Sequence, residues 1–184
     1  MSGHHDQPRA NKTDAGNGSK AICRVSNVLR SPSPDPKRCA KKMKTLPVSA
    51  NDDQILQLAR EWAEALSRED YQAAYDITAH DPYYQWTPDL MRTVIQNYGS
   101  TEPLADGSIC RVTPIDTAHG GPTPRHLVER DAAAISPESN GARSIGSVWF
   151  DIPLDGEWSD LTATFEIRSE EDLLHLVLNE IHVF

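Results

Sequence analysis

Apolar positions recur at helical spacing over residues 51–99 and alternate with polar positions over residues 148–184. The first pattern predicts amphipathic helices, because residues three and four apart share one helix face. On the first helix that face holds Ile55, Leu58, Ala59, Trp62 and Leu66. We therefore predict that Trp62 is a core residue.

Polar capping residues mark the helix starts. Asn51 can cap the first helix, and Gln54 stands where a capping box places its partner. Thr87-Pro88-Asp89 predicts the start of the third helix, and Gly99 predicts its end. The expected faces of the second and third helices are Tyr71, Ala74, Tyr75 and Thr78, and Leu90, Val94 and Tyr98, with Met91 and Ile95 beside the last three.

The C-terminal pattern predicts an antiparallel meander. Apolar residues alternate over 148–154, 161–167 and 174–184. Asp155-Gly156 is a strong hairpin turn, and residues 169–172 are expected to form a second one. Residues 109–115 and 126–135 are weaker strand candidates, because five prolines interrupt the region 100–146. Helices followed by an antiparallel sheet predict an α+β domain.

Charge divides the chain into two parts. Residues 1–44 carry all the lysines, with ten Lys/Arg and three acids, whereas residues 45–184 carry eight arginines and 24 acids. The first part has too few large apolar groups to form a core, so we predict a disordered basic tail and one domain over 45–184. Alternatively, translation begins at Met43 and the preceding residues are not part of the native protein.

Composition restricts the function classes. The acidic domain argues against nucleic acid, and no apolar run approaches the length of a membrane span. Three cysteines without a CxxC pair fit a reducing cytoplasm. We find no dinucleotide, P-loop, HExxH or GxSxG motif, and we predict no cofactor and no metal. Acidity favours encounter with a basic protein partner.

The helices and strands together carry a resemblance to a known family, through Trp62, Leu66, Asp70, Tyr71 and Tyr75 and through the strands over 148–150, 160–167 and 174–184. Their order resembles the NTF2-like (cystatin-like, SnoaL-type) superfamily. The segment 153–165 also resembles an uncharacterised family of small bacterial proteins. The resemblance implies N-terminal helices packed in a cone of curved antiparallel sheet. That fold hosts isomerases, dehydratases, immunity proteins and binding modules.

The outer face of the sheet is the first candidate site. The simplest register of the Asp155-Gly156 hairpin places Asp151 opposite Asp160, with Trp149 and Trp158 on the same face. The two carboxylates then share a proton, a cation or an arginine; alternatively both are solvated, or a bulge separates them. We expect the four residues to form one exposed patch, which serves as a homodimer or partner interface.

Glu180 and His182 are the candidate catalytic residues. Continuing the register of the second hairpin, in which Glu166 faces His175, places them on the core side near Ser159. In a cone this is the mouth of a pocket, with Tyr75 as a further pocket residue, where an acid and a histidine can transfer a proton.

A bulge near Asn179 is the alternative at this position. It would turn Ile181 and Val183 inward and send Glu180 and His182 to solvent. The direction of His182 therefore distinguishes the two arrangements.

Two functions follow from these patterns. The first is a non-enzymatic binding protein that acts through the outer sheet face, for example an immunity-type neutraliser of a basic partner. The second is a small-molecule isomerase or dehydratase that uses Glu180 and His182 in a cone-shaped pocket. A solvent-facing His182 would leave that pocket with little acid–base equipment.

Overall fold

The computed structural model describes residues 43–131 and 143–184. The predicted basic tail therefore lies, apart from its last two residues, outside the described residues. The helices are α1 (Asp52–Ser67), α2 (Tyr71–Ile77) and α3 (Pro88–Gln96), with a short 3-10 turn at Ile115–Thr117. The strands are β1 (Leu46–Pro47), β2 (Ala79–His80), β3 (His126–Arg130), β4 (Arg143–Leu154), β5 (Glu157–Glu170) and β6 (Leu173–Val183). These helices and strands confirm the predicted α+β class.

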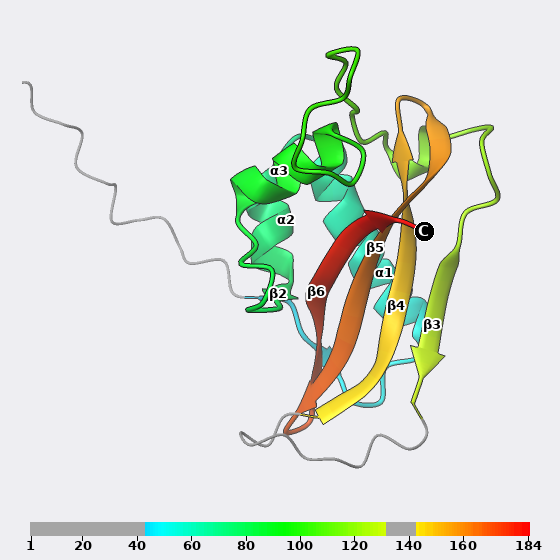
Figure 1. Ribbon diagram of the computed structural model, residues 1–184. Helices are drawn as coiled ribbons and strands as arrows, with labels where there is room; N and C mark the ends of the chain where they lie inside the picture. Colours follow the sequence, from blue (N-terminus) through cyan, green and yellow to red (C-terminus); the bar gives the residue numbers. More distant parts are fainter. Residues whose placement is uncertain (1–42, 132–142) are drawn as a thin grey trace, which may run out of the picture. The chain divides into compact units, whose positions relative to one another are not determined.

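The strands form one curled sheet in the order β1-β6-β5-β4-β3, and β2 pairs with β6 in parallel. The long strands β4, β5 and β6 make the antiparallel meander predicted from the alternation. The described helices pack on one side of this sheet, and no described helix covers the other side (Figure 1). We call the covered side the inner face and the other side the outer face.

Helix α1 begins at the capping box predicted from the sequence. The side chain of Asn51 accepts a hydrogen bond from the backbone N–H of Gln54 at 2.9 Å. The side chain of Gln54 accepts one in return from the backbone N–H of Asn51 at 3.0 Å. These two bonds satisfy N–H groups that the first turn of a helix leaves unpaired. The predicted apolar stripe of α1 is buried along its whole length.

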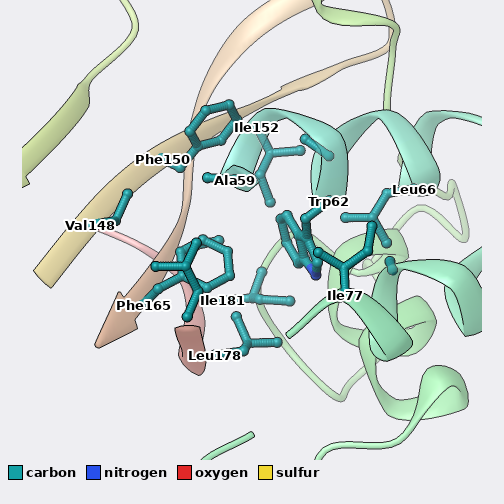
Figure 2. Packing of buried hydrophobic residues seen from close by; sticks show 14 of the residues in the cluster. Ala59, Trp62, Leu66, Ile77, Val148, Phe150, Ile152, Phe165, Leu178 and Ile181 are labelled. Carbon is teal, nitrogen blue, oxygen red and sulfur yellow. The ribbon is translucent and has the colours of Figure 1, made fainter. Parts of the chain in front are cut away.

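The core fills the space between α1 and the inner face of the sheet. Trp62 is fully buried and meets the ring of Phe165 edge to face, with ring centroids 5.1 Å apart. Phe150, Ile152 and Leu178 extend the same apolar layer from the strands (Figure 2). The prediction that Trp62 belongs to the core is confirmed.

Helix α3 buries a different stripe from the one predicted. Met91, Val94 and Ile95 are buried, whereas Leu90 is half-buried and Tyr98 is exposed. Tyr98 lies beyond the end of the helix in the left-handed region, with φ +54°. Its direction is therefore not set by the helical period, which is why the predicted stripe failed there.

Among the described residues between α3 and β4, one of the two predicted strands is present. The predicted strand over 126–135 is present as β3, and residues 132–135 of that prediction lie outside the described residues. Residues 109–115 form no strand, although Val112 makes an isolated antiparallel bridge to Leu154.

The first hairpin contains a bulge that changes the predicted register. Its turn is at Asp155-Gly156, as predicted, and Pro153 pairs with Trp158. A register shift between Asp151 and Pro153 then places Asp151 opposite Thr162. The predicted pairing of Asp151 with Asp160 is therefore wrong, because three residues of β5, 159–161, lie opposite the single residue Ile152 of β4, and this bulge in β5 includes Asp160.

The second hairpin is tighter than predicted. Glu170 pairs with Leu173, so the turn has two residues instead of four. Arg168, not Glu166, consequently faces His175. Farther along, Leu178 pairs with Phe165 and Glu180 pairs with Thr164, which leaves Asn179 as the extra residue of a second bulge.

Candidate functional site

The outer face of the sheet carries a cluster of three rings and one guanidinium. The guanidinium of Arg125 lies 4.5 Å from the ring centroid of Trp149 and 5.7 Å from that of Phe184. The rings of Trp149 and Phe184 are 4.9 Å apart, and those of His182 and Phe184 are 5.3 Å apart. We call Arg125, Trp149, His182 and Phe184 the outer-face cluster.

Strand pairing explains why these residues share a face. His182 pairs with Thr162, and Thr162 pairs with Asp151 two residues after Trp149. Directly opposed residues of antiparallel strands point to the same side of a sheet, as do residues two apart on one strand. Leu127 pairs with Trp149 and extends the same surface onto β3. Leu127 is 43% exposed and Phe184 is 53% exposed, so the apolar part of this surface is open to a partner.

Asp151 fixes Arg125 in this cluster. The carboxylate accepts hydrogen bonds from the hydroxyl of Thr162 at 2.6 Å and from the backbone N–H of Arg125 at 2.5 Å. The Arg125 guanidinium lies 3.9 Å from the same carboxylate and donates to the Thr162 hydroxyl at 3.2 Å. Asp151 itself is only 6% exposed. The expectation that it belongs to an exposed patch is therefore wrong, because Arg125 and Thr162 cover it.

Trp158 and Asp160 do not join Trp149 and Asp151 in one patch. The Trp158 ring contacts His126, whose ring stacks on the core residue Phe150 at 4.0 Å. Asp160 is exposed and accepts a hydrogen bond from the phenol of Tyr98, and this bond raises the pKa of Tyr98 to about 12. The bulge in β5 therefore separates the four residues that the simplest register would have grouped.

Glu180 and His182 lie outside the core, as the bulge alternative predicted. Ile181 is buried between them, whereas His182 is exposed. The carboxylate of Glu180 accepts a hydrogen bond from the phenol of Tyr84, and this bond raises the pKa of Tyr84 to about 12. Glu180 and His182 both line a groove of about 470 Å³ along the edge of β6, together with Trp86.

Tyr75 and Ser159 contact neither Glu180 nor His182 through a hydrogen bond or a ring. The Ser159 hydroxyl donates to the carbonyl of Ile152 at 2.6 Å and thus joins the bulge in β5 to β4. Tyr75 stacks on the ring of His80, with centroids 3.8 Å apart. These are structural contacts of the hairpin and of α2.

The contact between Tyr75 and His80 gives a prediction about pH. Burial lowers the pKa of His80 from 6.5 to about 4, against the opposing effect of Asp76. The unfolded chain therefore binds a proton between these two pH values that the folded chain does not bind. Stability contributed by neutral His80 is complete above about pH 6.5 and is lost as the pH falls towards 4.

We expect the urea midpoint of the wild type to fall between pH 7 and pH 5 by more than that of His80→Phe. The phenylalanine keeps the ring against Tyr75 and removes the titrating group. Equal falls in the two proteins would show that His80 does not contribute to the acid sensitivity.

Four residues of these surfaces were not among the candidate site residues predicted from the sequence. Arg125 follows a proline-rich loop and is brought to Trp149 only by the pairing of β3 with β4. Tyr84 and Trp86 stand in the aromatic run Tyr83-Tyr84-Gln85-Trp86 between two helices, which is a detectable signal for an aromatic cluster, and Trp86 is its buried member. Phe184 stands two positions after His182, which is two positions after Glu180. Its side chain is therefore expected on the same face as theirs once the bulge at Asn179 is known.

Comparisons with family models, with curated proteins and with solved structures find no match to this chain. Within residues 43–131 and 143–184, no helix combines the length and the apolar character needed to span a bilayer. In the same ranges, no group of three His, Cys, Asp or Glu side chains is arranged to hold a metal ion.

Proposed function

We propose that this chain is a protein-binding domain that contacts its partner through the outer face of the sheet. The observation that carries the proposal is the outer-face cluster, which combines Trp149, Phe184 and Arg125 on a side of the sheet without a described helix. Tryptophan and arginine are enriched among residues that dominate binding energy at protein interfaces. The adjacent exposed Leu127 widens the apolar area.

The position of Arg125 supports the same proposal. Its backbone N–H and its guanidinium are both held against Asp151 and Thr162, and its guanidinium lies over the Trp149 ring. A side chain that is already ordered loses less conformational entropy when a partner docks. The cluster is therefore preorganised for contact, unlike an isolated arginine on a surface.

The inner face is filled by core side chains, which supports a binding role for the domain rather than catalysis in an internal pocket. An isomerase or dehydratase of the kind expected from the sequence needs its acid–base pair inside a cone-shaped pocket. Trp62 and Phe165 fill the space between α1 and the sheet, and Glu180 and His182 lie on the far side of the Asn179 bulge. This arrangement supports a domain that acts through its surface.

We further propose that the fold is NTF2-like and that the partner is basic. Support for the fold is the pair α1 and α2 packed in a curled antiparallel sheet (Figure 1). Support for the partner is the acidity of residues 45–184, which carry 24 acidic residues and only eight arginines. This charge favours encounter with positive surfaces. An immunity-type neutraliser of a basic protein is one form of this function, and a homodimer through the same face is the competing outcome.

The test compares substitutions of Trp149, which is half-buried in the outer-face cluster, and of Val48, an exposed apolar residue elsewhere, in a pull-down from cells that make this protein. Trp149→Ala should reduce the amount of retained partner about 30-fold, as expected for a residue that dominates binding. Val48→Ala is the control, because Val48 is 48% exposed and its backbone bonds to Asp172 at the opposite end of β6. It should retain the partner as the wild type does.

Sedimentation of the purified proteins separates the two kinds of partner. A wild-type dimer that Trp149→Ala dissociates would identify the partner as a second copy. Equal retention by both variants, together with a monomeric wild type, would overturn the proposal that the outer face is an interface.

A further inference from the structure

The groove along the edge of β6 shares His182 with the outer-face cluster, but its other lining residues are different. Its lining includes two aromatic residues from the segment before α3, two aliphatic residues of α3 and two polar residues of β6: Tyr84, Trp86, Leu90, Val94, Glu180 and His182. Its volume of about 470 Å³ lies in the range of small-molecule sites in proteins. The groove is therefore large enough for a small organic molecule.

One wall of the groove is aromatic and fixed. The indole N–H of Trp86 donates to the carbonyl of Asn179 at 2.8 Å, so the bulge in β6 anchors this ring. The rings of Tyr84 and Trp86 are nearly parallel, at 26°, with centroids 6.1 Å apart. That separation leaves no room for a group between them, and the two rings form one continuous surface.

The charge in the groove comes from Glu180. One oxygen of its carboxylate accepts the hydrogen bond from Tyr84, which holds the group beside the aromatic wall. Within residues 43–131 and 143–184, no lysine, arginine or histidine forms an ion pair with Glu180. An oriented carboxylate next to aromatic rings attracts a cation both by its charge and through the ring quadrupoles.

We propose that this groove binds a small alkylammonium cation, a ligand class distinct from the protein partner of the outer face. The ammonium group lies against Glu180 and the aromatic wall, and the alkyl part contacts Leu90 and Val94 on α3. An anion would be repelled by the carboxylate. A neutral molecule of the same shape would cover Glu180 without compensating its charge.

Choline and its uncharged carbon isostere 3,3-dimethylbutan-1-ol are the probes that test this proposal. Binding is followed in the full chain by the NMR signal of the Trp86 indole N–H, assigned with Trp86→Phe. Choline should shift this signal saturably, and the isostere should bind at least about ten-fold more weakly. Equal binding of the two, or no shift with choline up to about 100 mM, would overturn the proposal.

Glu180→Gln tests the residue that supplies the charge. The amide oxygen can still accept the hydrogen bond from Tyr84, so the groove keeps its shape while it loses the negative charge. Choline should then bind at least about ten-fold more weakly. Glu171→Gln is the matched control, because Glu171 is an exposed acid in the turn at the other end of β6. An unchanged affinity in Glu180→Gln would contradict the proposal.

A peptide ligand tests whether the groove binds a free cation or a cationic protein side chain. A short peptide with a trimethyllysine carries the same ammonium group on a chain. Tighter binding of choline than of this peptide is the expected result. If the peptide shifts the Trp86 signal and choline does not, the groove recognises a protein side chain and the assignment to a small molecule is wrong.

Discussion

Trp62→Ala should lower the free energy of unfolding by about 3–5 kcal/mol, the range for truncation of a buried aromatic side chain. Trp62 is fully buried in the middle of the α1 stripe and packs edge to face on Phe165. The substitution removes this contact and leaves a cavity between α1 and the sheet. Because domains are commonly stable by only about 5–15 kcal/mol, the change should be evident in a urea titration.

Two further variants serve as comparisons for Trp62→Ala. Trp62→Phe keeps an aromatic ring and removes an indole N–H that has no hydrogen-bond partner among the described residues, so it should cost less than Trp62→Ala. Tyr83→Ala removes a ring that is 83% exposed and should change stability by less than about 0.5 kcal/mol. Near-wild-type stability of Trp62→Ala would contradict the assignment of the α1 face to the core.

Asp151→Ala is expected to lower the free energy of unfolding by about 2–3 kcal/mol, because it leaves buried donors without an acceptor. The Thr162 hydroxyl and the backbone N–H of Arg125 both donate to this carboxylate. The guanidinium of Arg125 also loses its neighbouring charge. The loss should appear in the same urea titration and should be accompanied by a change in the environment of Trp149, over which Arg125 lies.

Asp116→Ala is the matched control for this prediction. Asp116 also pairs with an arginine, Arg60, at 3.0 Å, but its side chain is 85% exposed. Exposed ion pairs contribute about 0–1 kcal/mol, so the control should be nearly neutral. Equal losses in the two variants would show that burial of Asp151 does not set the energy of its hydrogen bonds.

Local signals in the sequence predicted the parts of the fold that depend on neighbouring residues. The capping box at Asn51 and Gln54 is a contact over three positions, and the Asp155-Gly156 turn is decided within the hairpin itself. The Trp62 stripe likewise follows from helical spacing within α1. Each of these features is formed by residues close together in the chain, and each is present in the structure.

Long-range contacts account for the parts that the sequence did not predict. The bulge at Asn179 is stabilised by the Trp86 indole, 93 positions away, and no pattern in β6 fixes its place. The bulge in β5 is joined to the neighbouring strand β4 by the hydrogen bond from Ser159 to the carbonyl of Ile152, which the apolar alternation does not indicate. The single extra residue in β6 reverses the side on which the following side chains lie. The two extra residues in β5 move Asp160 away from Asp151 and disperse the predicted patch of Trp149, Asp151, Trp158 and Asp160.

Photo-cross-linking from position 127 tests whether the outer face of the sheet binds another protein. Leu127 is exposed beside Trp149, and a photoreactive phenylalanine analogue there lies within the proposed interface. The same analogue at position 48 is the control. We expect one discrete cross-linked protein from position 127, none from position 48, and loss of the product when Trp149 is also replaced by alanine. Products of equal yield from both positions, or a product that persists in Trp149→Ala, would contradict it.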